Sequence, residues 1–472
     1  MFFPVPRVTI SALRGGSGKT IISVGLLGLW RESGQTIVPF KKGPDFIDAG
    51  WLSFASGLPC HNLDPFLMTE KQILDLFITY SQGVDLCVIE GNRGLFDGVD
   101  VKGTSSTAEL AKLLDSPVLL IVDATMTTRT TAALVKGCQS FDPDLHIEGI
   151  ILNRVATPRQ EHLIRQAIEY YCNVPVVGSV PRIKTNPFPE RHMGLVPHHE
   201  SSVAQKAVQW AISIVKDNLD LDKIGQIAQQ VPLVHHDKTR EPIQKVSTEV
   251  QESSPRIGVI LDSVFWFYYP ENLELLKSLG AKLVEINTMK DPLLPPVDAL
   301  YIGGGFPETR AEALAMNVSL RNHLKQKIEN GLPVYAECGG FMFLGESLIV
   351  GDKSYPMVGA VPIVFVLEKR PQGHGYTIME VTKDNPYYAK GEKIKGHEFH
   401  YSRPVIQCEK DIQYVFRVIR GNGIEGQKDG LCKKNLLATY THIHAAGDPR
   451  WATRMLRVAN LAKRRGKIPK PP

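Results

Sequence analysis

A glycine-rich loop near the start of the chain is the feature that most restricts the fold. The segment ALRGGSGKT (12–20) follows an apolar stretch, RVTISAL (7–13), and leads into an amphipathic one, KTIISVGLLGLWRESG (19–34). A phosphate-binding loop needs this order of strand, loop and helix, because backbone N–H groups and the helix N-terminus surround the phosphates. The end of the segment matches that motif, although Leu13 stands where its first glycine is usual. We expect phosphate contacts from Gly15, Gly16, Gly18, Lys19 and Thr20.

Apolar runs alternate with helical patterns along the chain, which favours an α/β fold built on parallel sheets. In the first half the expected strands are TIVPFK (36–41), DLCVIEG (85–91), PVLLIVDA (117–124), IEGIILNRV (147–155) and VPVVGSV (174–180). A second series contains RIGVILD (256–262), KLVEIN (282–287), ALYIGGGFPE (299–308) and LPVYAECGG (332–340). These runs are rich in Val, Ile and Leu without alternation, as strands buried on both faces are.

The length and a polar segment predict two domains. A chain of 472 residues exceeds one ordinary domain, and HHDKTREPIQKVSTEVQESSP (235–255) has no apolar face. We expect a nucleotide-binding domain at 1–220, a linker at 221–255 and a second domain at 256–465.

Composition excludes several classes of protein. The net charge of +5, from 54 basic and 49 acidic residues, does not suggest a nucleic-acid partner. Seven dispersed cysteines without CxxC spacing fit a reducing compartment. No apolar run approaches a membrane span, and no basic segment precedes an apolar one at the N-terminus. We expect a cytoplasmic protein without a membrane partner.

Carboxylates follow two of the expected strands of the first domain. Glu90 ends DLCVIE, and Asp97 lies beyond the next glycines. Acidic side chains at the carboxyl edge of a parallel sheet face the crevice where ligands bind. Asp45 and Asp48 in FKKGPDFIDAG (40–50) face the same way if the segment is helical and opposite ways if it is extended. Any one of these acids could instead be a helix cap or a solvated charge.

A second motif surrounds Cys338. The cysteine follows an apolar strand and precedes glycines and a helix, where the helix dipole lowers a thiol pKa. Backbone N–H groups of Gly339 and of the turn at Gly304 and Gly305 could stabilise an oxyanion. A thiol also needs a base, which His442 or His444 could supply from a probable strand that points both to one face. A metal site or plain strand packing is the alternative for these two histidines.

These motifs together resemble the cobyrinic acid a,c-diamide synthase family. The resemblance is carried over nearly the whole chain by PFKKGPDFIDAGW, NLDPF, IEGNRGLFDG, STAELAKLL, FDPDL, GIILNRV, RHMGLVP, YIGGGFPE, AECGGFMFL, HEFHYS and YTHIH. It implies an N-terminal P-loop domain similar to dethiobiotin synthetase and a C-terminal class I glutamine amidotransferase domain of flavodoxin-like fold. The implied substrates are ATP, glutamine and a corrinoid tetrapyrrole, with Mg²⁺ as cofactor and a monomer or homodimer as assembly.

The resemblance also implies a reaction and roles for individual residues. ATP would phosphorylate the a and c acetate carboxylates of the corrin, and ammonia from glutamine would displace the phosphate. Thr20 and Glu90 would bind Mg²⁺, and Asp45, Asp48 and Asp97 would act at the phosphoryl-transfer site. Asn153 would contact adenine. Cys338 would form a thioester with glutamine, and His442 would be its base.

Two departures from the family pattern leave questions open. Many class I amidotransferases carry a Glu two residues after the His, where this chain has His444, so a Cys–His dyad or a third member from elsewhere is possible. Glu398 and His400 in HEFHYS are not placed by the sequence. The loop ALRGGSGKT also lacks the run of small residues that often leads the family loop, so Arg14 could contact phosphate or face water.

Two other functions fit parts of the sequence. The same chemistry could act on Ni-sirohydrochlorin in the coenzyme F430 pathway. Arg14-Gly15-Gly16 also resembles the loop of ParA/MinD-type ATPases, which do not amidate a substrate and have no need of a thiol nucleophile such as Cys338.

Overall fold

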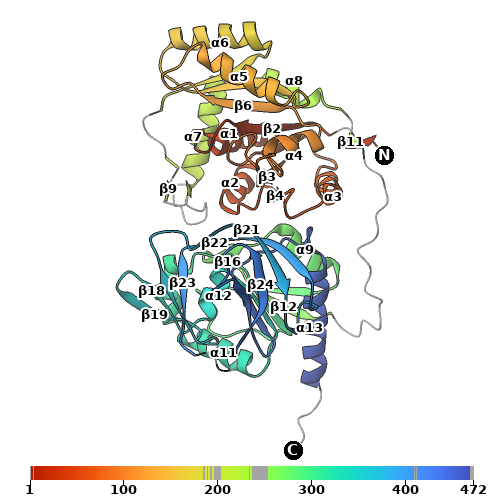
Figure 1. The fold of residues 1–472 in the computed structure, drawn as a ribbon, viewed down its shortest axis with the longest axis vertical. Coiled ribbons are helices and arrows are strands. Elements are labelled where there is room, and N and C mark those ends of the chain that lie inside the picture. The colour runs from red at the N-terminus through yellow and green to blue at the C-terminus, as the bar shows by residue number, and fades with distance from the viewer. Residues whose placement is uncertain are drawn as a thin grey trace, which may run out of the picture. The chain divides into compact units, whose positions relative to one another are not determined.

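The structure is a computed structural model that describes residues 2–3, 5–183, 187–188, 190–191, 194–195, 204–232, 234–235, 254–408, 410 and 412–467. The chain divides into two compact units, Met1–Thr239 and Arg240–Pro472, and the division falls within the segment expected to be a linker. Each unit is an α/β structure, as expected (Figure 1).

The start of the expected linker is structured and belongs to the first unit. Leu221–Gln229 forms helix α8, which buries Ile224, Ile227 and Ala228 in the core of that unit. Its apolar positions are few because the helix is short, so the sequence pattern did not reveal it. Residues 236–253 of the same segment lie outside the described residues.

A seven-stranded parallel sheet is the centre of the first unit. Its order is β4-β3-β5-β2-β6-β7-β8. The expected strands are all present, as β2 (Arg7–Ala12), β3 (Ile37–Lys42), β5 (Leu86–Glu90), β6 (Val118–Asp123), β7 (Ile147–Val155) and β8 (Val176–Pro181). The short edge strand β4 (His61–Leu63) was not predicted. The described part of this unit also contains two short antiparallel strand pairs. One joins β1 (Phe2–Phe3) to β11 (Val234–His235), and the other joins β9 (Glu190–Arg191) to β10 (Gly194–Leu195).

Helices pack on this sheet around two hydrophobic cores. One core contains α1 (Lys19–Glu32), α2 (Ile47–Ser56), α7 (Ala204–Asn218) and α8. The other contains α4 (Thr107–Leu113), α5 (Thr130–Phe141) and α6 (Pro158–Cys172) (Figure 1). Helix α3 (Glu70–Tyr80) begins with a capping box formed by Thr69 and Gln72. Helices α1 and α7 can approach closely because Gly25 of α1 has no side chain. A Cβ added there would lie 2.4 Å from the Ala211 carbonyl oxygen.

The second unit contains a nine-stranded mixed sheet. Its parallel part has the order β14-β12-β15-β17-β26, which is the 2-1-3-4-5 order of a flavodoxin-like fold. These strands are Lys282–Ile286, Arg256–Ile260, Ala299–Ile302, Val334–Glu337 and Leu436–Thr439, in that order. Antiparallel strands β25 (Lys428–Lys433), β24 (Gln413–Arg420), β21 (Gly373–Val381) and β22 (Lys393–His400) extend it from β26.

Smaller elements complete this unit. A four-stranded sheet has the order β19 (Lys353–Pro356), β18 (Ser347–Val350), β20 (Ile363–Leu367) and β23 (Ser402–Ile406). Strands β13 (Phe265–Phe267) and β16 (Gly304–Gly305) form a separate pair. The helices are α9 (Pro270–Ser278), α10 (Ala311–Met316), α11 (Val318–Glu329), α12 (Gly339–Leu344) and α13 (Arg450–Lys467), with a 3₁₀ turn, η2, at Pro307–Arg310.

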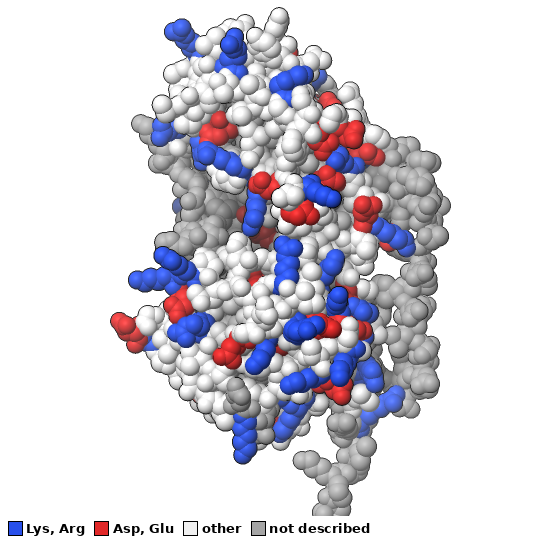
Figure 2. All heavy atoms as spheres, in the orientation of Figure 1, with Lys and Arg blue, Asp and Glu red and all other residues white. Residues whose placement is uncertain are grey.

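Two surface properties bear on the expectations from composition. Basic and acidic side chains are interspersed on the face shown in Figure 2. Among the described residues, no helix combines the length and apolar character needed to cross a lipid bilayer.

Candidate active sites

The phosphate-binding loop lies where β2 ends and α1 begins, as the sequence predicted. Gly16 and Gly18 have positive φ angles of 68° and 93°, which glycine adopts without strain. The Lys19 ammonium donates to the Arg93 carbonyl oxygen at 2.7 Å, and burial lowers the pKa of Lys19. The Asn153 side-chain amide donates to the Ser17 carbonyl oxygen at 2.8 Å, so Asn153 contacts the loop directly.

Carboxylates from two strand ends gather beside this loop. The Thr20 hydroxyl donates to Glu90 Oε1 at 3.2 Å. Asp48 lies in the first turn of α2, whereas Asp45 lies just before that helix, and the Asp48 backbone N–H donates to Asp45 Oδ1 at 2.8 Å. Burial and the charge of Asp48 raise the pKa of Asp45 to about 7. Asp97 accepts the Gly94 N–H at 2.8 Å and its charge acts on Lys19.

Lys41 is a buried member of this site that the sequence reasoning missed. Its ammonium lies 2.5 Å from Glu90 Oε1 and 2.7 Å from Asp48 Oδ2, and its side chain is 1% exposed. Although burial alone would lower the pKa of Lys41, the two carboxylates raise it above its ordinary value. The signal in the sequence was a lysine inside a buried strand, which requires a charged partner.

Arg14 contacts a neighbouring strand end. It forms an ion pair of 2.8 Å with Asp123, which also binds Arg154 at 2.7 Å. Arg154 in turn donates to the Gly16 carbonyl oxygen at 2.9 Å. The two arginines therefore fix the outer part of the loop through one carboxylate.

Cys338 occupies a sharp elbow between β17 and α12. Its backbone has φ 46° and ψ −103°, a sparsely populated conformation for a residue with a side chain. Such strain persists only where the surrounding structure imposes it, and it is frequent at functional sites. The thiol is buried, and it lies 3.7 Å from the Phe399 carbonyl oxygen. Burial raises the pKa of the Cys338 thiol, which corrects the expectation that the helix dipole lowers it.

The glycines predicted for the oxyanion site surround this elbow. A Cβ at Gly339 would lie 2.8 Å from the Gly305 nitrogen, so the two backbones are in close contact. A Cβ at Gly304 would lie 2.3 Å from His442 Cε1 and 3.1 Å from Nε2. The structure thus brings Gly304, Gly305 and Gly339 together with one edge of the His442 ring.

The two histidines near the end of the chain have different partners, which corrects the expectation that one strand points both to one face. Strand β26 ends at Thr439, and His442 instead forms an isolated bridge with His397. His442 Nδ1 lies 3.3 Å from Glu337, whereas His444 Nε2 lies 3.5 Å from Glu271. Glu337, next to Cys338 in the sequence, was not predicted as a site residue.

Glu398 and His400, which the sequence did not place, are buried on β22. Glu398 accepts backbone N–H groups from Asn422 at 2.5 Å and Gly423 at 3.0 Å. His400 stacks on Tyr440 with ring centroids 3.6 Å apart, and burial lowers the pKa of His400 to about 4.

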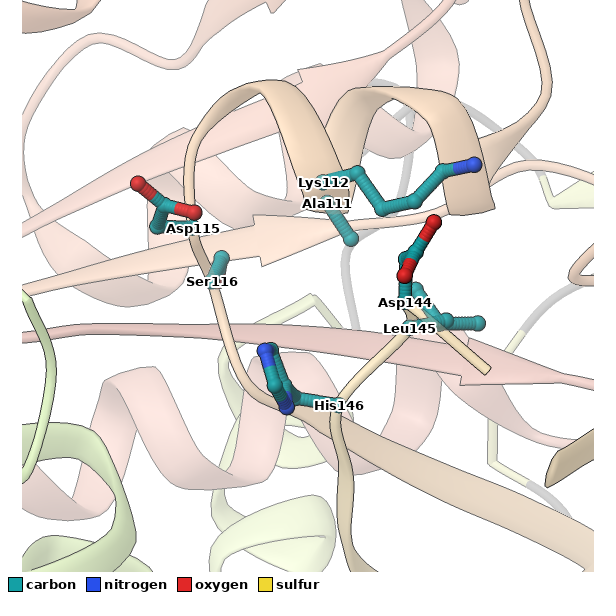
Figure 3. Close-up of a pocket in the computed structure, with 7 residues that line it drawn as sticks. All are labelled: Ala111, Lys112, Asp115, Ser116, Asp144, Leu145 and His146. Atoms are coloured by element: carbon teal, nitrogen blue, oxygen red, sulfur yellow. The ribbon is translucent and has the colours of Figure 1, made fainter. Parts of the chain in front are cut away.

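The cavity in Figure 3 is remote from the phosphate-binding loop. It measures about 210 Å³ and is lined by Ala111, Lys112, Asp115, Ser116, Asp144, Leu145 and His146. These residues precede β6 and β7, so they lie at the amino ends of the parallel strands, whereas the loop after β2 lies at the carboxyl ends. A larger cavity of about 480 Å³ includes Arg93 and Asp97 and lies along the loop after β5.

A P-loop unit together with a flavodoxin-like unit that carries a buried cysteine at a strand-to-helix elbow defines an ATP-binding glutamine amidotransferase. Residues 8–196 match the CobQ/CobB/MinD/ParA nucleotide binding domain, and residues 256–450 match the CobB/CobQ-like glutamine amidotransferase domain.

Relatives match nearly the whole chain. A cobyrinate a,c-diamide synthase of Magnetococcus marinus is 42% identical over 453 residues, which are 96% of this chain and 97% of that protein. The enzyme of the same name from Archaeoglobus fulgidus is 41% identical over 464 residues, 97% of this chain and 98% of that one. The chain belongs to the cobyrinate a,c-diamide synthase family, and it is a glutamine-dependent amidating ligase.

Proposed function

We propose that the protein converts the a and c acetate carboxylates of cobyrinate into amides, with ATP as the activating substrate and glutamine as the source of ammonia. The observation that carries this proposal is the identity of 41–42% to enzymes of that name over nearly the full length of both chains. The two sites supply the two half-reactions that such an enzyme needs.

The first half-reaction activates a carboxylate. A carboxylate resists ammonia because its oxygen is a poor leaving group, and transfer of the γ-phosphoryl group of ATP gives an acyl phosphate with a good one. Backbone N–H groups of Gly15, Gly16 and Gly18 and the Lys19 ammonium bind the triphosphate. Lys41, between Asp48 and Glu90, adds a fixed positive charge beside the phosphoryl group. Asn153 is assigned to the adenine side of the loop because of its contact with Ser17.

The residues at this site fit a magnesium ion. Glu90 Oε2 is buried and has no hydrogen-bond partner among the described residues, and the Thr20 hydroxyl lies 3.2 Å from Oε1 of the same side chain. Thr20 and Glu90 would hold the ion, with Asp45, Asp48 and Asp97 nearby. Oxygen ligands of this kind suit Mg²⁺. When bound, Mg²⁺ neutralises charge on the phosphates.

The second half-reaction releases ammonia from glutamine. Cys338 Sγ forms a bond to the side-chain amide carbon after its proton moves to His442. N–H groups of Gly305 and Gly339 stabilise the oxyanion, and the amide nitrogen takes the proton and leaves as ammonia. Water then hydrolyses the thioester to glutamate. The ammonia displaces phosphate from the acyl phosphate, which forms the amide.

The acceptor can be tested directly by mass spectrometry. We expect cobyrinate, incubated with the protein, Mg-ATP and glutamine, to lose 1 Da per amidation in two successive steps, as the chemistry requires when OH is replaced by NH₂ twice. Ni-sirohydrochlorin serves as the parallel acceptor. Amidation of the nickel compound with no change in cobyrinate would contradict the assignment and move the protein to the other tetrapyrrole. Cobyrinate labelled with ¹⁸O in its carboxylates should transfer one label to inorganic phosphate per amide, and unlabelled phosphate would contradict the acyl phosphate.

A further inference from the structure

We infer that Glu337 is a positioning residue that holds His442 in the tautomer needed to accept a proton from Cys338. The inference rests on the proposed function, in which His442 is the base of glutamine hydrolysis. It assigns the third member of the site to the residue immediately before the nucleophile, and not to the position two residues after the histidine.

The geometry places a carboxylate at one ring nitrogen and the nucleophile site at the other edge of the ring. Glu337 Oε2 lies 3.3 Å from His442 Nδ1, and both side chains are 2% exposed. The Cε1–Nε2 edge of the ring faces Gly304, beside the Gly305–Gly339 contact next to Cys338. When Nδ1–H donates to a carboxylate, Nε2 is left unprotonated and able to accept a proton.

The elbow at Cys338 explains how Glu337 can contact His442 while the next residue, Cys338, acts as the nucleophile. Glu337 is the last residue of β17, whereas Cys338 turns out of the strand with φ 46°. The Glu337 side chain therefore stays within the core while Cys338 begins α12. A residue of ordinary strand conformation at 338 would continue the strand instead.

The carboxylate is itself held in place. Glu337 Oε1 accepts the Ile443 N–H at 3.4 Å, and Oε2 accepts the Tyr301 hydroxyl at 3.4 Å. Asn272 donates to the Tyr301 hydroxyl at 3.2 Å and to the Ile443 carbonyl oxygen at 3.0 Å. The segment around His442 is thus fixed to β15 and α9. A positioning role needs such a rigid second layer of contacts.

Charge gives the same assignment. Burial, followed by the charge of Glu308, raises the pKa of the Cys338 thiol, so the thiol is protonated at neutral pH. Its proton can leave only if the imidazolium that forms on His442 is stabilised, and the Glu337 carboxylate lies beside Nδ1 of that ring. Burial raises the pKa of Glu337, and the His442 ring opposes that shift, so the two groups stabilise each other's charged forms. The other histidines that act on His442, His397 stacked at 4.9 Å and His400, have pKa values lowered by burial and stay neutral.

His444 provides the matched control. It stands where many class I amidotransferases carry their glutamate, and its Nε2 lies 3.5 Å from Glu271. Glu271 and Glu337 are therefore two buried carboxylates, each 3.3–3.5 Å from a histidine, in the same unit. Only Glu337 lies beside the histidine that faces the glycine turn.

The test compares Glu337→Gln with Glu271→Gln in the full-length protein. For Glu337→Gln we expect kcat of glutamine hydrolysis to fall by about 100-fold or more, the effect of a wrong tautomer, with KM for glutamine within about threefold. The acid limb of its kcat/KM profile should move to lower pH, because the imidazolium loses its neighbouring negative charge. Amidation with free ammonia should remain within about twofold for both variants, and glutamine hydrolysis by Glu271→Gln within about threefold.

Glu337→Asp keeps the test decisive if the amide variant folds poorly. Its carboxylate should restore kcat at least about tenfold above Glu337→Gln and keep the acid limb at the wild-type pH. Wild-type glutaminase activity in Glu337→Gln, or a loss equal in both variants with an unmoved acid limb, would overturn the inference. Cys338→Ala and His442→Ala test the proposed function separately: if they remain active, that function fails, and if they lose activity while Glu337→Gln does not, only this inference fails.

Discussion

At the residue scale, the ATP-binding unit depends on one buried lysine that neutralises two carboxylates. Lys41 contacts Asp48 at 2.7 Å and Glu90 at 2.5 Å, and removal of a buried partner costs about 3 kcal/mol. We predict that Lys41→Met lowers the free energy of unfolding by about this amount without Mg²⁺. The measurement is thermal unfolding, where the loss corresponds to roughly 8 °C.

Two controls accompany the Lys41→Met prediction: the same variant measured with Mg²⁺, and a substitution of a surface lysine. The ion should recover part of the loss in Lys41→Met, because it returns positive charge to Glu90. Lys112 pairs with Glu109 and Asp142 but is 27% exposed, so Lys112→Met should cost about 1 kcal/mol or less. Equal melting temperatures for Lys41→Met and the wild type would contradict the assigned charge balance.

A buried carboxyl in the second unit predicts how stability depends on pH. Burial raises the pKa of Asp429 to about 7, and the charge of Glu398 contributes to the same shift. In an unfolded chain the pKa of an aspartate is about 4. The folded protein thus binds this proton more tightly. The contribution to stability is complete below pH 4 and is lost as the pH rises through 7.

Asp429→Asn should remove this dependence. At pH 8 we expect the variant to be more stable than the wild type by about 2 kcal/mol, with a flatter decline between pH 5 and pH 8. Urea unfolding at a series of pH values measures both quantities. Asp100→Asn, at an exposed site, should leave the decline between pH 5 and pH 8 unchanged, because hydrogen bonds from Thr104 lower the pKa of Asp100 and it titrates below that range. An identical pH slope in Asp429→Asn and the wild type would show that Asp429 is not the titrating group.

At the scale of elements, the strand pair β13–β16 positions the proposed oxyanion site. A Cβ at Gly305 would lie 1.8 Å from the Val264 carbonyl oxygen, too close for any side chain without movement of the turn. We predict that Gly305→Ala lowers glutamine-dependent activity by about 100-fold or more, the size of an oxyanion-site defect. Ammonia-dependent activity should be retained, and both are read from the rate of amide formation.

Gly137 in α5 provides the control, because we expect an alanine there to stabilise the protein and to leave the glutamine-dependent activity unchanged. Apart from the adjacent residues and the nearby backbone of α5 itself, no described atom lies within 4 Å of the Cβ that would be added there. Gly137→Ala should stabilise the protein by about 0.5–1 kcal/mol, since alanine is the better helix former. A similar loss of glutamine-dependent activity in Gly137→Ala and Gly305→Ala would mean that the effect is not local to the turn.

The strands were predictable from sequence, but the contacts between them were not. Buried parallel strands appear as continuous Val-, Ile- and Leu-rich runs, so β2, β5 and β6 were found, whereas three-residue β4 carries too little pattern. Lys41 and Glu90 are direct partners in the β3–β5 register. Because register follows from packing of the whole sheet, a sequence pattern could give each residue but not the pair.

The site around Cys338 shows the same limit. Its elbow and glycines were identifiable because a strand, Gly-rich turn and helix follow one another along the chain. The Glu337–His442 contact joins residues 105 positions apart. The expected strand through His442 and His444 was wrong because other contacts hold that segment after β26 ends: Asn272 donates to the Ile443 carbonyl oxygen, and Glu337 accepts the Ile443 N–H.

At the scale of the whole molecule, we propose that the first unit activates the acceptor and the second unit releases ammonia. The sequence supported two domains because two separate series of strands each carried a complete chemical motif. The boundary was less predictable, since α8 continues the first unit into the expected linker.

The division of labour is tested most directly by one measurement on Cys338→Ala: mass spectrometry of cobyrinate after incubation with Mg-ATP and either glutamine or ammonium chloride. We predict no amide with glutamine and two amides with ammonium chloride at about the wild-type rate. Lys19→Met serves as the reciprocal control, with no amide from either nitrogen source while glutamine is still hydrolysed. Amide formation from glutamine by Cys338→Ala, or no amide from ammonium chloride by that folded variant, would contradict the proposed roles of the two units.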